Sequence, residues 1–528
     1  MDSQQFKVAA TSAIDEIIQY YDNIHERRVL STVEPGYLKK LLPDGPPQEG
    51  ESWADIQKDI ESKIMPGLTH WQSPNFMAFF PASSTYPAML AELYSAAFTA
   101  PAFNWICSPS VTELETVVMD WLAKLFNLPE CYMSSTYGGG VIQGSASEAI
   151  VTVMVAARDK YLRETTAGLS GLELEDAIAH KRSKLVVLGS EMVHSSTQKA
   201  TQIAGVRFRS VPALASNDFG MTGEDLEKVL EECRSQGLEP FFLTAALGTT
   251  STCAVDDFES IASVLSKFAP PDVPGEVWVH IDAAYAGAAL VCPEYHHFTS
   301  SFQHFHSFNM NMHKWLLTNF DASCLYVKKR KDLVDALSIT PSYLRNEFSE
   351  SGLVTDYRDW QIPLGRRFRS LKIWFVLRTY GVKGLQEHIR KHVKFGELFA
   401  GLLKTRGDLF HIITGPSFAL TVLNIVPKSQ GIDAQNSITK EVYELINKRG
   451  EIYLTSAVVA GTYAIRVVSA NEKAEEKYIR RAFEILVETT EELRDGKARK
   501  QNVNAVMMNG KAGGVGEAAV VNGNGLPN

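Results

Sequence analysis

The stretch Val277-Trp278-Val279-His280-Ile281-Asp282-Ala283-Ala284-Tyr285 decides the fold class. Residues 277–281 form a mainly apolar run, and the carboxylate of Asp282 and the small residues Ala283 and Ala284 follow directly. Continuous apolar runs of this length are typical of strands buried on both faces of a mainly parallel sheet. Comparable runs occur on either side of it, at 185–188, 241–243 and 324–327. Because helical or loop segments separate these runs, the sequence predicts an α/β core.

Outside this core the pattern changes. Strand-like runs at 419–422 and 464–468, followed by a helix with Ile479 and Leu486 on its apolar face, predict a smaller α+β unit. A helix is predicted near the N-terminus, with an apolar stripe that the main body or a second subunit must cover; the stripe consists of Ile14, Ile17, Ile18, Tyr21 and Ile24. Another helix is predicted from Thr112, which can form a capping box with Glu115.

Composition excludes several classes of protein. The formal charge is −9 with 21% charged residues, whereas a nucleic-acid binder usually carries a basic face. No apolar run is long enough to cross a membrane, and the first residues do not resemble a secretory signal. Six cysteines at irregular spacing fit free thiols in a reducing compartment, which predicts a cytoplasmic location. Five clustered histidines lack the spacing of metal ligands, so no metal site is predicted; they are His296, His297, His304, His306 and His313.

Three features along the core carry the chemistry. The first is Gly138-Gly139-Gly140, followed by Gly144 and then by Ser145-Ala146-Ser147 at the start of a predicted helix. Small residues allow close backbone approach, and the N–H groups at a helix start bind phosphate. A purely structural glycine turn explains the glycines equally well. The lysine and hydroxyl residue of a nucleoside-triphosphate P-loop are absent after Gly144, and no G-x-G-x-x-G follows a strand, so an NTPase and a nucleotide-dependent oxidoreductase are disfavoured.

The other two features are a carboxylate and a lysine at strand ends. Asp282 either caps the next helix or binds a pyridinium nitrogen and keeps it protonated, because ligands of α/β sheets lie beyond the carboxyl ends of strands. Lys314 directly follows the predicted strand that ends near Asn311, among apolar and aromatic residues. A lysine in such surroundings is driven toward its neutral, nucleophilic form. The order of these three features along the chain, with the phosphate loop first, then Asp282 and then Lys314, is a more specific signal than any one feature alone.

The chain resembles the group II pyridoxal-phosphate decarboxylases, and among them the aromatic L-amino-acid decarboxylases. The similarity is carried by nine stretches in family order: EPGYL (34–38), HWQSPNFMAFFPASSTYPAML (70–90), SPSVTELETVVMDWL (108–122), GGGVIQGSASEA (138–149), HSSTQKA (194–200), ALGTTSTCAVDDF (246–258), VWVHIDAAYAG (277–287), NMHKWLLTNFD (311–321) and LVTDYRDWQIPLGRRFRSLKIWFVLRTYGVKGLQ (353–386). It reaches from about residue 34 to 390 and continues more weakly to about 490.

This resemblance implies a fold-type I transferase-like architecture with a mainly parallel seven-stranded sheet. The expected divisions are an N-terminal helical segment packing on a partner subunit (1–85), a large cofactor-binding domain (86–390), a small C-terminal α+β domain (391–493) and a disordered tail (494–528). The family forms intertwined homodimers, so a homodimer is expected.

The resemblance also implies site residues. Lys314 would carry pyridoxal 5'-phosphate as a Schiff base, Asp282 would pair with its ring nitrogen, and His194 would stack on the ring. Tyr343, on a mobile loop, would return a proton to the α-carbon after carbon dioxide leaves. The remaining implied cofactor contacts are Ser145, Ala146, Ser147, Thr250, Ala284, Asn311, His313 and Gly365.

An aromatic-lined substrate pocket is implied as well, and its expected residues are Trp71, Phe79, Phe80, Ala82, Pro101, Phe103, His194 and Phe320, some of them from the partner subunit. Relatives often carry hydroxyl side chains where this chain has Phe79 and Ala82, which puts a preference for catechol or phenol rings in doubt. Gly365 leaves room that is compatible with an indole. The sequence therefore predicts decarboxylation of tryptophan, 5-hydroxytryptophan, tyrosine, DOPA or phenylalanine, with a hint toward the first two.

Two other functions remain open. An aromatic aldehyde synthase of the same family couples decarboxylation to oxidative deamination, and in such relatives the loop Tyr or the stacking His is replaced. This chain keeps Tyr343 and His194, which favours simple decarboxylation. A non-catalytic relative that only binds the cofactor or a partner is disfavoured because Lys314 and Asp282 are also retained.

Overall fold

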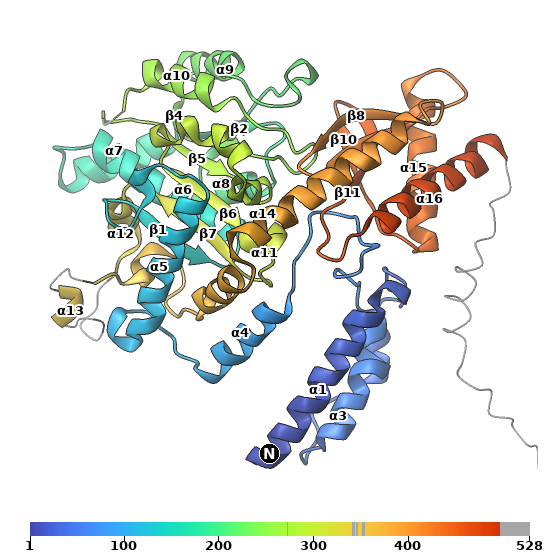
Figure 1. Ribbon diagram of the computed structural model, residues 1–528. Helices are drawn as coiled ribbons and strands as arrows, with labels where there is room; N and C mark the ends of the chain where they lie inside the picture. Colours follow the sequence, from blue (N-terminus) through green and yellow to red (C-terminus); the bar gives the residue numbers. More distant parts are fainter. Residues whose placement is uncertain (272, 340–343, 345–346, 351–353, 497–528) are drawn as a thin grey trace, which may run out of the picture.

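A computed structural model describes residues 1–271, 273–339, 344, 347–350 and 354–496 of the chain (Figure 1). Its largest element is a seven-stranded sheet in the order β1-β7-β6-β5-β4-β2-β3. β7 runs antiparallel to both of its neighbours, whereas the other strands share one direction. The mainly parallel α/β core is therefore confirmed. Its strands are β1 Gly139–Gln143, β2 Leu185–Ser190, β3 Arg207–Val211, β4 Glu239–Ala246, β5 Trp278–Asp282, β6 Ser307–Asn311 and β7 Ser323–Val327.

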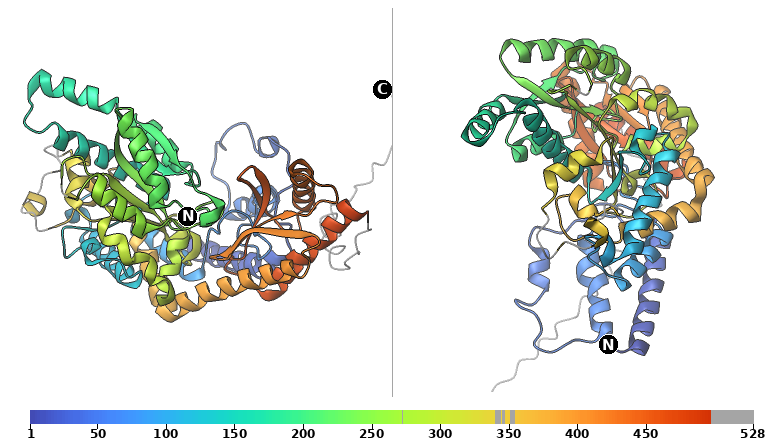
Figure 2. Two further views of the ribbon diagram at one scale, coloured as in Figure 1. Left: turned by 90° about the horizontal axis from the view of Figure 1, so that it is seen from above. Right: turned by 90° about the vertical axis from the view of Figure 1, so that its left-hand side faces the viewer.

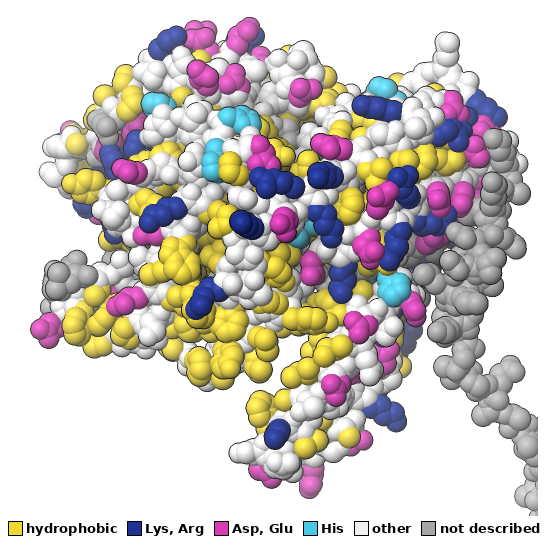
Figure 3. Space-filling model, in the orientation of Figure 1, with side chains coloured by type: hydrophobic (Ala, Val, Ile, Leu, Met, Phe, Trp, Pro, Cys, Tyr) yellow, Lys and Arg dark blue, Asp and Glu magenta, His cyan; other side chains and the backbone are white. Residues whose placement is uncertain are grey.

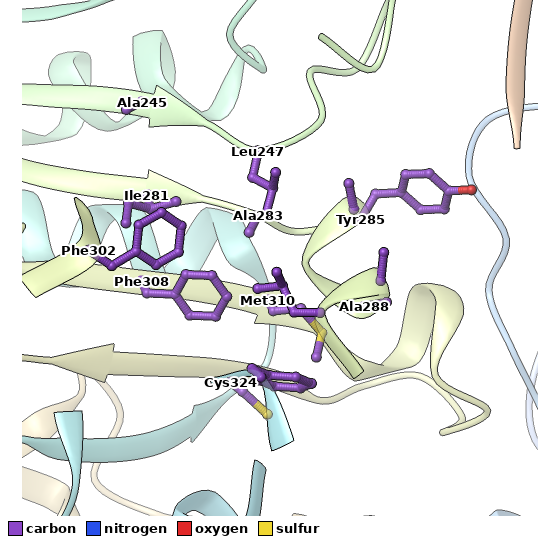
Figure 4. Close-up of a cluster of buried hydrophobic side chains, with 14 of the residues drawn as sticks. Ala245, Leu247, Ile281, Ala283, Tyr285, Ala288, Phe302, Phe308, Met310 and Cys324 are labelled. Atoms are coloured by element: carbon purple, nitrogen blue, oxygen red, sulfur yellow. The ribbon is translucent and has the colours of Figure 1, made fainter. Parts of the chain in front are cut away.

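Helices cover the large sheet on its faces (Figures 1 and 2). On one face Ile281, Phe308 and Met310 project from adjacent strands into a continuous buried cluster (Figure 4). Burial on both sides explains the unbroken apolar strands. The helices of this domain are α5 Pro109–Leu125, α6 Ala146–Thr165, α7 Gly171–Arg182, α8 Ser196–Ala204, α9 Gly223–Ser235, α10 Phe258–Phe268, α11 Met312–Trp315, α12 Arg330–Leu337 and α13 Glu347–Glu350, with 3-10 turns at η4 Trp105–Cys107, η5 Glu130–Tyr132, η6 Ala215–Asn217, η7 Ala286–Val291, η8 Pro293–His304 and η10 Tyr357–Trp360.

Two local predictions are wrong. The glycines at 139 and 140 lie inside β1 and not in a loop; a Cβ at Gly140 would come within 2.8 Å of Tyr326, so close packing between strands and helices requires them. The helix predicted near Thr112 is present and begins at Pro109, a residue suited to the first helical turn, but the capping box predicted at Thr112 is wrong. Glu115 is buried and accepts a hydrogen bond from the Ile142 N–H at 2.8 Å, so it is not part of a capping box.

A smaller domain follows the long helix α14 Arg369–Lys404, which bends at Gly381, where φ is 62°. Its four strands form an antiparallel sheet in the order β10-β11-β9-β8. This confirms the predicted strands near 420 and 465 and the closing helix. The elements are β8 Phe410–Ser417, β9 Leu420–Ile425, α15 Ile432–Arg449, β10 Thr455–Val459, β11 Thr462–Val468 and α16 Glu476–Asp495.

The N-terminal helices project from this body. α1 Ser3–Asn23 and α3 Trp53–Asp59 lie side by side (Figures 1 and 2), joined by a hydrogen bond of 3.0 Å between Ser12 and Gln57. Of the predicted apolar stripe, Ile14, Ile17 and Ile18 are exposed, whereas Tyr21 and Ile24 are buried. Apolar side chains also gather over α4 Tyr86–Ala97 (Figure 3). The remaining short elements are η1 Ile24–Glu26, α2 Tyr37–Leu41, η2 Ile60–Ile64 and η3 Met65–Gly67. No described helix has the length and hydropathy needed to span a bilayer.

Candidate active site

A cavity of about 230 Å³ lies where the carboxyl ends of the parallel strands meet. The residues that follow β1, β2, β4, β5 and β6 all contribute to its wall, which is the expected ligand position in such a sheet. Ten of the predicted cofactor residues line it: Ser145, Ala146, Ser147, His194, Thr250, Asp282, Ala284, Asn311, His313 and Lys314. Tyr343 lies outside the described residues.

One end of the cavity is built to receive an anion. Ser145 caps α6, accepting a hydrogen bond from the Glu148 N–H at 3.1 Å. Among the described residues, the N–H groups of Ala146 and Ser147 have no acceptor, as expected in a first helical turn. His313 lines the same cavity and accepts the Ala322 N–H at its Nδ1 (2.9 Å), so in the neutral ring Nε2 carries the proton. Burial lowers the pKa of His313 to about 4 and keeps it neutral.

Hydrogen bonds from Ser83 and Thr85, which are distant in sequence, hold the turn that carries Lys314. Ser83 donates its N–H to the His313 carbonyl at 2.9 Å and its hydroxyl to the Lys314 carbonyl at 2.8 Å. Thr85 donates its hydroxyl to the Leu317 carbonyl at 2.8 Å. These two residues, whose side chains are both buried, fix the backbone of a helix of only four residues.

The Lys314 amine has no hydrogen-bond partner among the described residues. Its Nζ lies 5.6 Å from the centroid of the Phe80 ring. Desolvation by the surrounding protein lowers the pKa of Lys314, while the carboxylate of Asp282 acts in the opposite direction. A neutral amine is a nucleophile, so this environment suits attack on a carbonyl group.

Asp282 ends β5 at the cavity wall. Its Oδ1 accepts the Ala284 N–H at 3.1 Å, so the carboxylate does cap the following turn. In the part of the chain that the structure describes, Oδ2 has no such donor, which leaves one oxygen for a ligand. His194, which also lines the cavity, accepts hydrogen bonds at Nδ1 from Ser196. Desolvation is the main cause that lowers the pKa of His194.

Residues 35–426 match the family described as the pyridoxal-dependent decarboxylase conserved domain. This chain belongs to that family. It is 43% identical to tyrosine decarboxylase 2 of Narcissus pseudonarcissus over 488 residues, covering 92% of this chain and 94% of the relative. It is 42% identical to a phenylacetaldehyde synthase of Arabidopsis thaliana over 491 residues, covering 92% and 96%. Its fold matches a crystal structure of Oryza sativa TDC with PLP and tryptamine, with a TM-score of 0.88, 36% identity and coverage of 94% and 99%.

The cofactor of this decarboxylase is pyridoxal 5'-phosphate, and the cavity fits it. The free N–H groups of α6 suit its phosphate and the open Asp282 oxygen suits its ring nitrogen. The Oδ1 atom of Asn311 is buried at the cavity wall without a hydrogen-bond donor from the described part of the chain, which marks a place where a ligand completes the polar contacts.

The predicted substrate residues of the decarboxylase do not all line one cavity. Phe80, His194 and Phe320 line the cavity. Trp71 and Phe79 stack on each other at 5.5 Å and are largely exposed, beside Tyr453 of the small domain. The Ala82 carbonyl accepts a hydrogen bond from Gln72.

Pro101 and Gly365 line a separate surface cavity of about 540 Å³ beside α4, and the two cavities share no lining residue. A Cβ at Gly365 would meet nothing within 4 Å. Phe103 lines neither cavity and is partly buried.

Sequence reasoning missed several parts of the site. Tyr285 stacks on Phe80 with ring centroids 3.7 Å apart and continues the aromatic wall. Its place three residues after the strand-end carboxylate Asp282 was the available signal. Ser83 and Thr85 gave no local signal, because their partners lie more than 200 positions away. The other missed lining residues are Val193, Thr244, Ala246, Gly248 and Thr249. Among the described residues, no group of His, Cys, Asp and Glu side chains is arranged to hold a metal ion.

Proposed function

We propose that this chain decarboxylates an aromatic L-amino acid to an arylalkylamine and carbon dioxide. The observation that carries the proposal is one cavity that brings Lys314, Asp282 and the start of α6 together with the rings of Phe80 and Phe320. An aromatic wall suits an aromatic side chain. The names of the relatives, among them tyrosine and tryptophan decarboxylases, support this substrate class.

The bound cofactor supplies an electron-withdrawing ring that accepts the electron pair of a breaking bond at the α-carbon. In this proposal Lys314 holds the cofactor through its amine and receives it back after turnover. Asp282 holds the proton on the ring nitrogen, and the α6 N–H groups and His313 bind the phosphate. His194 covers the ring, and the aromatic wall excludes water. The Tyr343 hydroxyl donates a proton to the α-carbon after carbon dioxide leaves.

An aromatic aldehyde synthase is the second candidate, because a phenylacetaldehyde synthase is 42% identical to this chain. The presence of Tyr343 and His194 favours simple decarboxylation. A non-catalytic cofactor-binding relative is the third, and the retained Lys314 and Asp282 argue against it.

Product analysis distinguishes these functions. Purified holoenzyme given tryptophan, 5-hydroxytryptophan, tyrosine, DOPA and phenylalanine in competition is expected to release amine and carbon dioxide in equal amounts, as measured by mass spectrometry. The dominant amine identifies the preferred substrate. We expect Tyr343→Phe to divert the reaction, so that oxygen and water are consumed and aldehyde, ammonia and hydrogen peroxide accompany the carbon dioxide. Peroxide from the unmodified enzyme would support the synthase, and no product from any substrate would support the non-catalytic relative.

We also propose a homodimer in which each site is completed by the other chain. Pro101 and Gly365 lie on a surface cavity next to the exposed apolar side chains of α4, and Leu93 there is 51% exposed. An apolar surface of this kind favours a protein partner. In the proposed dimer, a second copy packs against α4, and Pro101 and Gly365 of one chain lie near the cofactor cavity of the other chain.

Sedimentation velocity tests the dimer. Leu93→Asp is expected to weaken association at least about thirtyfold, because a charge would replace an apolar contact at the centre of the interface. The matched control is Leu172→Asp on α7, where the side chain is 77% exposed and far from α4 in sequence. Equal association of both variants would show that α4 is not the interface.

The proposed location is the cytoplasm. All six cysteines are free thiols in the structure, which fits a reducing compartment.

A further inference from the structure

Within the described part of the chain, Arg466 is a buried cation without a counter-ion. It lies on β11 of the small domain, and its residue surface is 4% exposed. Its Nε donates to the Ser251 carbonyl at 3.3 Å, and its Nη1 donates to the Thr455 hydroxyl at 3.0 Å. Its Nη2 is buried with no acceptor. No carboxylate among the described residues forms an ion pair with it.

This arrangement is costly, because a buried charge is usually paired. The contacts of Arg466 are neutral oxygens, which solvate the guanidinium without cancelling its charge. Desolvation lowers the pKa of Arg466 to about 10, so the group is still charged near neutral pH. Its positive field therefore acts on whatever lies nearby.

The Phe80 ring places Arg466 beside the site. The guanidinium carbon lies 5.3 Å from the ring centroid, and the Lys314 amine lies 5.6 Å from the same centroid. Tyr285 stacks on this ring at 3.7 Å, and its hydroxyl is fixed by donation to the Phe418 carbonyl at 2.6 Å. Two basic side chains from different domains thus share one aromatic ring, which attracts both of them.

We propose that Arg466 is an electrostatic positioning residue: its uncompensated charge acts together with desolvation to favour the neutral form of the Lys314 amine whenever that amine is not bonded to the cofactor. The proposal rests on the proposed role of Lys314. It goes further because it gives a residue of the small domain a role in keeping the Lys314 amine nucleophilic.

The other groups around the Lys314 amine must be considered to predict whether loss of the Arg466 charge raises or lowers the pKa of Lys314. Asp282 on β5 favours the charged amine, whereas desolvation and Arg466 on β11 favour the neutral amine. Burial raises the pKa of the Cys253 thiol to about 12, so this group also remains neutral. His194 and His313 lie on the same cavity, and both have lowered pKa values. The Tyr285 hydroxyl, whose pKa burial raises well above the ordinary value, remains neutral. Removal of the Arg466 charge should therefore raise the pKa of Lys314.

The test measures the amine directly. Full-length chain freed of cofactor is treated with acetic anhydride at a series of pH values, and the peptide that contains Lys314 is quantified by mass spectrometry. Only the neutral amine reacts: its lone pair forms the amide bond, acetate leaves and the proton passes to water. We expect the midpoint of labelling to rise by about one pH unit in Arg466→Met, the shift expected when a nearby charge is lost.

Arg466→Lys is the matched control, because it keeps the charge and loses the planar fork. Its labelling midpoint should stay near that of the unmodified chain. Arg466→Gln provides a second neutral variant if the methionine variant does not fold, as judged by near-UV circular dichroism. A midpoint in the neutral variants equal to that of the unmodified chain would overturn the proposal. So would a lysine variant that shifts as far as the neutral ones, because the hydrogen bonds and not the charge would then matter. The readout needs no turnover, so it separates this proposal from the proposed reaction.

Discussion

Replacement of Lys314 by alanine is expected to lower kcat by at least about a thousandfold, equivalent to about 4 kcal/mol of barrier. The variant loses the amine that faces the cavity, while the turn that carries it remains held by Ser83 and Thr85. Borohydride reduction of the unmodified holoenzyme should attach the cofactor to the peptide that contains Lys314, as mass spectrometry of a digest would show.

Lys314→Arg is the informative companion, because it retains length and charge but cannot form an imine with the cofactor. We expect it to be as inactive as the alanine variant. Lys228→Ala, an exposed change on α9, should leave activity and labelling unchanged. Cofactor attached to any other lysine after reduction would refute the assignment of Lys314.

Replacement of Asp282 by asparagine is expected to lower kcat/KM by about a hundredfold to a thousandfold. Loss of one partner of a desolvated charge pair costs about 3–4 kcal/mol. An asparagine oxygen can still accept the Ala284 N–H, so the turn after β5 should survive while the charge is lost. Steady-state kinetics with the best substrate measure the effect.

Asp282→Glu separates charge from position. It keeps the carboxylate on a longer side chain, and we expect activity between that of the asparagine variant and that of the unmodified enzyme. Unaltered kinetics in Asp282→Asn would mean that the carboxylate only caps the turn that begins at Ala283.

Much of the large domain could be predicted because its strands are buried on both faces, which leaves continuous apolar runs such as 277–281. Two strands escaped prediction for physical reasons. β3 reads Arg-Phe-Arg-Ser-Val and lies at the edge of the sheet, where half of its side chains face solvent. β1 contains glycines that the packing of Tyr326 requires, and these look like a turn in the sequence.

The residues of the candidate site likewise divide into those that the sequence could reveal and those that it could not. Asp282, Lys314 and Ser147 are close in space because each follows a strand or begins a helix at one edge of the sheet, and position along the chain reveals this. Arg466 could not be found, since its relation to the site depends on how the small domain packs against Phe80. The separate positions of Pro101 and Gly365 likewise depend on the packing of α4 and not on local sequence.

The way in which Ser83 and Thr85 hold the lysine turn also bears on how the protein matures. Ser83 and Lys314 are 231 positions apart, and His388, whose imidazole contacts the Trp315 carbonyl at 3.1 Å, follows later still. At usual rates of synthesis, roughly ten to fifty seconds separate the emergence of the first two residues from the ribosome. A turn whose carbonyls accept hydrogen bonds from such distant donors cannot form from local contacts alone. The nascent chain would therefore acquire its reactive lysine late, after the N-terminal segment has docked, which would limit premature capture of a reactive aldehyde by an unfinished enzyme.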